Sequence, residues 1–295
     1  MFASEHSNGE ADGMNVGRED GGVLEKRNMA SKVPPGYFEH DPPADLAGHI
    51  VCFWTRLPDP DAPPESRIHR VLPDGCVDIV IGFGGDGLSV AGSLEVTQAI
   101  GVGAMTRPIV ISGRMPDFYI GVRFRPGHAM SALGVPASEL TDERIAYSSI
   151  SESSDQDLEM LSRLETNDER FDAVVALVRR RLLGAMHVPL SVRAAVQRIT
   201  VANGNLRVAG LADDIGITRQ QLARQFATHV GVTPKTFARV MRARAALARA
   251  DAARAAYPRE IDWSAIACDL GYYDQPHFID DFKALTGVTP SRWVR

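Results

Sequence analysis

The hydrophobic pattern of the chain changes character near residue 150. Before that point, short apolar runs alternate with turns rich in proline and glycine, as strands do in a small antiparallel barrel or sandwich. After Ser151, apolar residues recur three and four positions apart, as they do on one face of a helix. The pattern predicts an α+β chain whose strands come first and whose helices come last. The strands are expected at residues 50–55, 76–81, 99–103, 108–111 and 118–124.

The same patterns divide the chain into four segments. Residues 1–36 are rich in Gly, Asp, Glu and Asn without a period, which predicts a disordered tail, with Met29 as an alternative start. Residues 37–150 are expected to form the β-rich domain, and residues 188–295 a wholly helical domain. Residues 151–187 hold two expected helices, which either connect the domains, provide a dimer contact or pack against their own domain.

Charge is distributed unevenly between the two ends of the chain. The whole chain has 32 Lys and Arg against 37 Asp and Glu, a net charge of −5. Residues 188–295 hold 15 of the basic and 9 of the acidic residues, which makes that segment +6 and leaves −11 for residues 1–187. Such asymmetry predicts a C-terminal part that binds a polyanion.

Composition excludes several classes of protein. No run of 18 apolar residues is present, so a transmembrane helix is not expected, and the N-terminus lacks the basic start and apolar core of a secretory signal. Cys52, Cys76 and Cys268 are far apart and form no CxxC pair, which argues against a disulfide scaffold and a multi-cysteine zinc site. We therefore expect a cytoplasmic protein.

The helical domain contains an internal repeat. Leu-Ala-x-Asp-x-Gly at 211–216 returns as Ile-Ala-x-Asp-x-Gly at 266–271, an offset of 55. The Leu, Phe and Gly-Val-Thr-Pro positions of 222–234 return as Phe, Phe and Gly-Val-Thr-Pro in 278–290, an offset of 56. A helix, a turn carrying glycine and a second, capped helix make a helix-turn-helix. The chain therefore holds two of them, unit one (211–234) and unit two (266–290).

Capping residues mark where the second helix of each unit begins. Thr218 is the expected N-cap in unit one, with Gln221 completing a T-x-x-Q capping box. Asp274 is the expected N-cap in unit two. In unit one, Leu222 and Phe226 are four residues apart and are expected to face inward. The residues that lie off that face and are available to a DNA groove are Arg219, Gln220, Ala223 and Arg224.

These motifs resemble the DNA-binding domain of AraC/XylS-type transcription regulators over residues 190–295. The matches are Leu-Ala-Asp-Asp-Ile-Gly at 211–216, Leu-Ala-Arg-Gln-Phe at 222–226, Asp-Gln-Pro-His-Phe at 274–278 and Phe-Lys-Ala-Leu-Thr-Gly-Val-Thr-Pro at 282–290, with Arg242, Arg244 and Ala245 on the expected linker helix. The resemblance implies a sequence-specific transcription regulator, not an enzyme, whose units read adjacent major grooves of double-stranded DNA. RNA polymerase and a second copy of the chain are expected further partners. The DNA-binding residues it implies are Thr218, Arg219, Gln220, Gln221, Ala223, Arg224, Asp274, Gln275 and His277.

Unit two departs from the family's pattern. The family usually has an arginine two residues after the phenylalanine of the second recognition helix, where this chain has Asp280. Residues 206–250 hold 8 basic and 2 acidic residues, whereas residues 251–295 hold 5 and 7. Unit one is therefore expected to dominate phosphate attraction. Gln275 and His277 are expected to reach base edges only if unit two docks, and Asp274 to accept from a cytosine amine only if it is not capping.

Two motifs of the β-rich domain are similar to an uncharacterised domain that precedes AraC-type domains in some bacterial regulators. They are Arg-Val-Leu-Pro-Asp-Gly-Cys-Val-Asp-Ile-Val-Ile at 70–81 and Ile-Gly-Val-Arg-Phe-Arg-Pro-Gly-His at 120–128. The similarity implies a sensor of a small-molecule effector or a partner-binding domain. Arg123 and Arg125 either bind an acidic effector or pair with Asp74 and Asp78, and we favour the pairing. The candidate ligand-binding residues are Arg70, Asp74, Asp78, Arg123 and Arg125.

Three weaker patterns favour no cofactor. Residues 82–87 read G-x-G-x-x-G, but an expected strand at 88–92 follows instead of a helix, which indicates a hairpin and not a dinucleotide site. His69, Cys76 and His128 are of metal-ligand type, yet no HxH or HExxH pattern is present, so no metal is expected. A redox pair of Cys52 and Cys76 is an alternative with nothing in the sequence to bring the two together.

Two other functional classes are alternatives to an effector-controlled regulator. The first is a metal-dependent barrel enzyme fused to a DNA-binding module. A DNA-alkylation repair protein is excluded, because the chain lacks the four-cysteine zinc cluster and the Pro-Cys-His-Arg nucleophile motif of such proteins. The second is a regulator without a ligand, controlled by protein contacts through residues 155–187.

Overall fold

A computed structural model describes residues 36–57, 69–84, 96–111, 118–151, 153–183, 187–256 and 261–293. Nearly all of the predicted tail, and the strand expected at 88–92, lie outside these residues. No helix in the described ranges is long and apolar enough to cross a membrane.

The described strands form an antiparallel sheet and a separate two-stranded pair. The order in the six-stranded sheet is β1-β2-β7-β4-β5-β8. Its strands are β1 (Tyr37–His40), β2 (Ile50–Arg56), β7 (Phe118–Phe124), β4 (Val77–Phe83), β5 (Val96–Val102) and β8 (Arg144–Ala146). β3 (His69–Val71) pairs with β6 (Ile109–Ile111). All five expected strands are present; β1, β3 and β8 are too short to show an alternating pattern.

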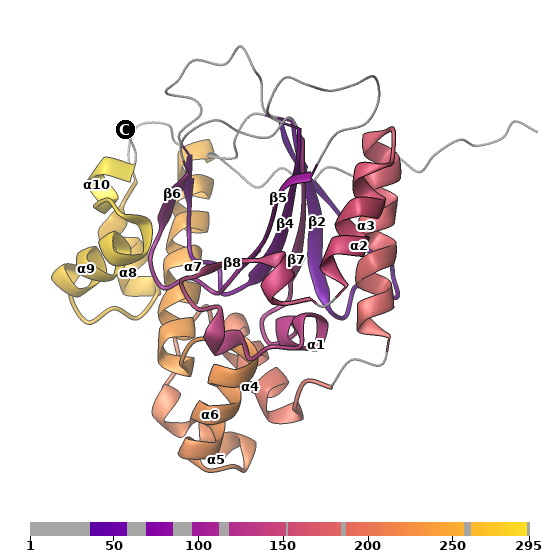
Figure 1. Cartoon of the computed structure of the whole chain (residues 1–295). Helices are drawn as coiled ribbons and strands as arrows, with labels where there is room; N and C mark the ends of the chain where they lie inside the picture. Colours follow the sequence, from indigo (N-terminus) through magenta and orange to yellow (C-terminus); the bar gives the residue numbers. More distant parts are fainter. Residues whose placement is uncertain are drawn as a thin grey trace, which may run out of the picture.

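Helices cover one face of this sheet (Figure 1). They are α2 (Ser154–Ser162) and α3 (Asn167–Leu182). The short helix α1 (Ala129–Leu133) lies at the end of the sheet against α3 and α6, and the 3-10 turns η2 (Ala137–Glu139) and η3 (Tyr147–Ser149) contact α6 and β5 respectively. Val174, Leu177 and Val178 of α3 face Ile79 and Val122 of the sheet around a cavity of about 20 Å³. The α+β class and the antiparallel sheet are confirmed. The described strands form an open sheet, because α3 occupies the face over which a barrel would close.

The C-terminal part is helical, as expected, and contains both units. Its elements are α4 (Leu190–Val201), η4 (Val208–Gly210), α5 (Leu211–Ile215), α6 (Arg219–Val230), α7 (Pro234–Ala256), α8 (Trp263–Asp269), α9 (Gln275–Thr286) and α10 (Pro290–Trp293). Unit one is α5 and α6, and unit two is α8 and α9. The 23-residue helix α7 joins them and runs between unit two and the β-rich domain, called the sheet domain from here on (Figure 1).

The buried apolar residues form two separate hydrophobic cores. The larger core is continuous from the sheet, through Phe53 and Phe124, into unit one at Leu222 and Phe226. The smaller core is formed by unit two, with Phe278 among its buried residues, and by Ala246 and Ala250 of α7, while Leu285 of α9 packs in the larger core. Unit one and the sheet domain therefore share a hydrophobic core, so their relative position is fixed by side-chain packing.

Candidate functional site

Helix α6 begins and ends where its capping residues place it. The Thr218 hydroxyl accepts a hydrogen bond from the Gln221 backbone N–H at 3.1 Å, which satisfies one of the free donors of the first turn. The reciprocal half of the expected capping box is not formed among the described residues. Gly216 (φ +80°) ends the preceding helix in the left-handed conformation, as predicted. The sharp turn between α5 and α6 is thus encoded locally.

One face of α6 is buried and the opposite face is exposed. Leu222 and Phe226 pack inward, and the Phe226 ring lies 5.7 Å from that of Phe237 on α7. Arg219 is held only loosely, because its Nη2 lies 3.9 Å from Oδ2 of the exposed Asp213. The residues of the candidate set exposed on α6 and at its cap are Thr218, Arg219, Gln220, Ala223 and Arg224, with Gln221 half-buried. Both arginines are therefore available to phosphates or base edges.

Asp274 caps α9 in unit two. Its Oδ1 accepts from the His277 backbone N–H at 2.8 Å, so the condition for a cytosine contact, a non-capping Asp274, is not met. Gln275 and His277 are exposed on the first turn. Tyr273, directly before the cap, is 95% exposed and was not singled out from the sequence. Its place beside the start of α9 was the available signal.

The adjacent aspartates Asp280 and Asp281 have different environments. Asp281 is 5% exposed and pairs with Arg239 of α7, with Oδ1 at 2.7 Å from Nη2 and 2.9 Å from Nε. Asp280 is exposed and forms no ion pair within the described part of the chain.

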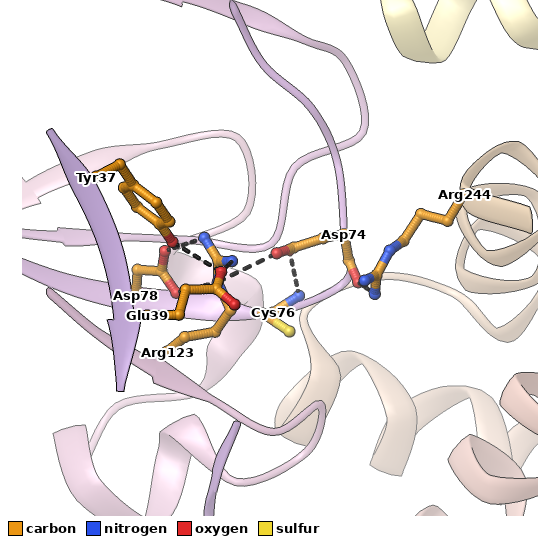
Figure 2. Close-up of polar contacts among 7 residues, drawn as sticks. All are labelled: Tyr37, Glu39, Asp74, Cys76, Asp78, Arg123 and Arg244. Carbon is orange, nitrogen blue, oxygen red and sulfur yellow. Dashed lines mark hydrogen bonds and ion pairs between the residues drawn. The ribbon is translucent and has the colours of Figure 1, made fainter. Parts of the chain in front are cut away.

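The sheet domain holds a half-buried ion cluster around Arg123 (Figure 2). Arg123 and Asp78 lie directly opposite on β7 and β4, and the guanidinium binds both carboxylate oxygens, at 3.1 and 3.0 Å. Asp74 Oδ2 lies 3.3 Å from Arg123 Nε, and Glu39 Oε1 lies 3.8 Å from Nη1. Tyr37 Oη donates to Glu39 at 2.9 Å. For Arg123 this is the pairing that the sequence favoured, but the same prediction was wrong for Arg125, which takes no part in the cluster in the described residues.

The other two candidate ligand-binding residues lie elsewhere. Arg125 donates from Nε to the Ala47 carbonyl at 2.8 Å. Arg70 lies beside Gly287 at the end of α9. Burial lowers the pKa of the Arg123 guanidinium, but the charges of Asp78 and Asp74 outweigh it and raise that pKa, whereas burial raises the pKa of Asp78. Glu39 was missed because its strand, β1, has four residues and no periodic signal.

Two domain families match the chain. Residues 211–295 match the family described as a helix-turn-helix domain, and residues 38–146 match a domain of unknown function, DUF6597. The helix-turn-helix match spans both units and the helix between them. The C-terminal part of the chain is an AraC-type helix-turn-helix domain, and the protein is a DNA-binding transcription regulator.

No curated protein sequence matches this regulator. Its chain is similar to crystal structures of ToxT from Vibrio cholerae. An apo form has 13% identity and a TM-score of 0.38, with coverage of 82% of this chain and 96% of that chain. A second ToxT structure has 11% identity, a TM-score of 0.38 and the same coverage. ToxT with a bound unsaturated fatty acid has 12% identity and a TM-score of 0.37, over 77% and 93% of the chains.

The alternative sites of the sheet domain are not assembled in the described part of the regulator. No group of three potential metal ligands occurs there, and the side chain of His69 lies outside it. Cys52 and Cys76 are free and buried, and burial raises the pKa of Cys52 to about 12 and that of Cys76 well above its ordinary value. Both thiols are thus poor nucleophiles at neutral pH. β4 pairs antiparallel with β5, and the G-x-G-x-x-G segment begins in β4, with its second half, residues 85–87, outside the described residues.

Basic side chains gather where the sheet domain of the regulator meets unit one. The Nδ1 atoms of His49 and His128 are 3.1 Å apart. The turn before His128 packs on α4 and α6, since a Cβ at Gly127 would lie 3.3 Å from Val192 and 4.0 Å from Val230. Burial lowers the pKa of His128 to about 4, helped by the positive potential of His49, Arg193, Arg125 and His229.

Acidification should destabilise the folded protein at the contact between the His128 turn and unit one. The folded state keeps His128 neutral down to about pH 4, whereas the unfolded state takes up a proton near pH 6.5. Stability from the neutral form is therefore complete above pH 6.5 and is lost as pH falls toward 4. Allowing for partial exposure, the loss should be about 2 kcal/mol. Thermal unfolding measured across this range should show it, and His128→Asn should flatten the profile; an unchanged profile in that variant would contradict the assignment.

Proposed function

We propose that this regulator reads DNA chiefly through the exposed face of α6. The observation that carries the proposal is that Arg219 and Arg224 project from a capped, buried-backed helix within a segment, 206–250, of net charge +6. Lysine and arginine side chains on such a surface release counterions from the phosphate backbone. Gln220, exposed between them in sequence, is suited to bidentate pairing with adenine.

We further propose that residues 37–150 are a regulatory domain and residues 188–295 the DNA-binding domain, with 151–187 between them. The shared core supports mechanical coupling of the first to unit one. A small-molecule effector, RNA polymerase and a second copy of the chain are proposed partners, and the cytoplasm is the proposed location. No catalytic role, metal or cofactor is assigned.

The proposed effector does not bind at Arg123. The carboxylates of Asp74, Asp78 and Glu39 already occupy the positions around that guanidinium that the carboxylate of an acidic effector would take. The 20 Å³ cavity between sheet and α3 has room for about one water, so an effector would have to open it or bind elsewhere. This argument supports a structural role for the ion cluster.

Binding to duplex DNA tests the proposal. The full chain is first given a random duplex pool, and the selected sequence is then compared with random DNA over a salt series. Binding should weaken steeply as salt rises. A folded chain that binds no duplex in a salt-dependent way would overturn the proposal.

Substitutions on α6 should relax sequence preference. Arg219→Ala or Gln220→Ala should remove roughly 1–3 kcal/mol of discrimination between selected and random DNA, because base contacts carry that discrimination. Arg163→Ala, at an exposed arginine that forms the C-cap of α2, is the charge-matched control and should bind as wild type does. Equal weakening on selected and random DNA would show that the α6 side chains contact only phosphate.

A further inference from the structure

One segment of the sheet domain touches both unit two and the helix α7 that joins the two units. It is Arg70–Cys76, the 70–76 segment, which leads from β3 into β4. It belongs to the motif by which the sheet domain is recognised, and the proposed DNA contacts do not use it. Its contacts extend in three directions.

The first contact is with unit two. A Cβ at Gly287, the left-handed C-cap of α9, would lie 3.5 Å from Arg70 Nε and 3.3 Å from Pro108 Cγ, which places both side chains against the end of this helix. A cation there also complements the helix dipole. Leu72 packs against the core of unit two. The recognition helix is thus held at its C-terminal end by the sheet domain.

The second contact is with the linker helix α7 (Figure 2). Arg244 donates from Nη1 to the Asp74 carbonyl at 3.3 Å. Gly75 has φ +78°, and a Cβ there would lie 2.4 Å from the Phe237 ring, so the turn approaches the helix as closely as a glycine permits. The segment therefore fits against α7 without a gap.

The third contact anchors the segment in its own domain. Asp74 Oδ1 accepts from the Cys76 backbone N–H at 2.9 Å, while Oδ2 lies 3.3 Å from Arg123 Nε. Arg123 is in turn fixed by its two bonds to Asp78. The turn is consequently tied to the central strands and moves only if they do.

We propose that the 70–76 segment positions unit two relative to unit one, so that the sheet domain sets the spacing between the two DNA segments the protein reads. This inference rests on the proposed DNA binding. Unit one shares a core with the sheet domain, and the segment gives unit two a separate attachment to the same body. Two recognition helices docked in successive major grooves lie about 34 Å apart, and rigidity between them makes that distance selective.

The linker helix offers a competing source of rigidity. Asp281 of α9 pairs with Arg239 of α7, the smaller core joins unit two to α7, and Leu285 of α9 packs in the larger core, so these contacts also tie unit two to the rest of the protein. If they alone fix unit two, removing the contacts of the 70–76 segment will leave spacing selectivity intact. The test therefore changes the segment and leaves the Asp281 pair in place.

The experiment measures affinity for the selected duplex, for the same duplex with one or two base pairs inserted between the two read segments, and for a duplex carrying only the first. The variants are Arg70→Gln with Leu72→Ala, and Arg244→Gln. Arg254→Gln, an exposed charge on the last turn of α7, is the matched control. Wild type and control should lose about tenfold in affinity on insertion, and the variants roughly twofold, within the usual range of coupling between sites.

The ratio between duplexes cancels any general loss of phosphate attraction. Equal insertion penalties in variants and wild type, or indifference of wild type to spacing, would overturn the inference, whereas a chain that binds no duplex would overturn the proposed function. Arg70→Gln alone changes an exposed side chain and serves if the double variant does not fold. Amide hydrogen exchange should quicken in α8 and α9 of the variants and stay unchanged in α6; no change in α8 and α9 would also count against it.

Discussion

Replacing Arg123 with methionine should lower the free energy of unfolding by about 2–3 kcal/mol near neutral pH, since removing one partner leaves half-buried charges uncompensated. Arg123 faces the carboxylates of Asp74, Asp78 and Glu39. Without the guanidinium, Asp78 keeps the desolvation that raises its pKa and loses the charge that opposes this. Thermal and urea unfolding of wild type and Arg123→Met measure the difference.

The deficit should shrink in acid. A buried carboxyl with a raised pKa destabilises the folded state while it is ionised, and this penalty disappears as pH falls through its folded pKa. The difference between variant and wild type should therefore narrow as the medium becomes acidic. Adding Asp78→Asn to Arg123→Met removes one unpaired charge and should restore part of the lost stability. If Arg123 served an effector instead, Arg123→Met would keep its melting temperature and lose only the ligand response.

Local signals in the sequence predicted the DNA-binding half well. Thr218, Gly216 and Asp274 define helix ends through contacts within a few residues, so their roles depend little on the rest of the chain. Inward-facing Leu222 and Phe226 follow from helical spacing alone. The double helix-turn-helix could therefore be predicted before any tertiary contact was known.

Contacts between distant residues could not be predicted in the same way. The pair of Arg239 and Asp281 joins positions 42 apart, and that of Arg244 and Asp74 joins positions 170 apart. The position of Asp281, three residues after Phe278, was a signal for burial on the inner face of α9. Its partner depends on the packing of α7 against α9, and no sequence pattern encodes that packing.

The spacing of apolar residues also could not predict which helix packs on the sheet. Apolar spacing predicted α3 but left open whether it joined the domains or covered the sheet. In the structure Val174 and Val178 pack over β4 and β7. Either arrangement buries the same face of the helix, so the periodic pattern is identical for both.

Neighbouring aspartates on α9 should respond in opposite ways to substitution. Asp281→Ala should destabilise the chain by about 2 kcal/mol, because Arg239 loses its partner in a partly buried site. Asp280→Arg should leave stability nearly unchanged and raise affinity for long duplexes by about tenfold, with a salt slope steeper by about one unit for each added phosphate contact. Melting temperatures and salt series on the same two proteins measure both effects.

The length of the duplex identifies the cause of any gain from Asp280→Arg. If α9 approaches the phosphate backbone, the arginine acts only on duplexes long enough to reach unit two, and a duplex spanning the groove of unit one alone should bind as in wild type. Asp280→Asn, which removes the repulsion without adding a cation, should give a smaller gain. An unchanged salt slope on long DNA would mean that unit two does not contact the duplex. The attraction to phosphates would then come from unit one alone, where the basic charge of residues 206–250 lies.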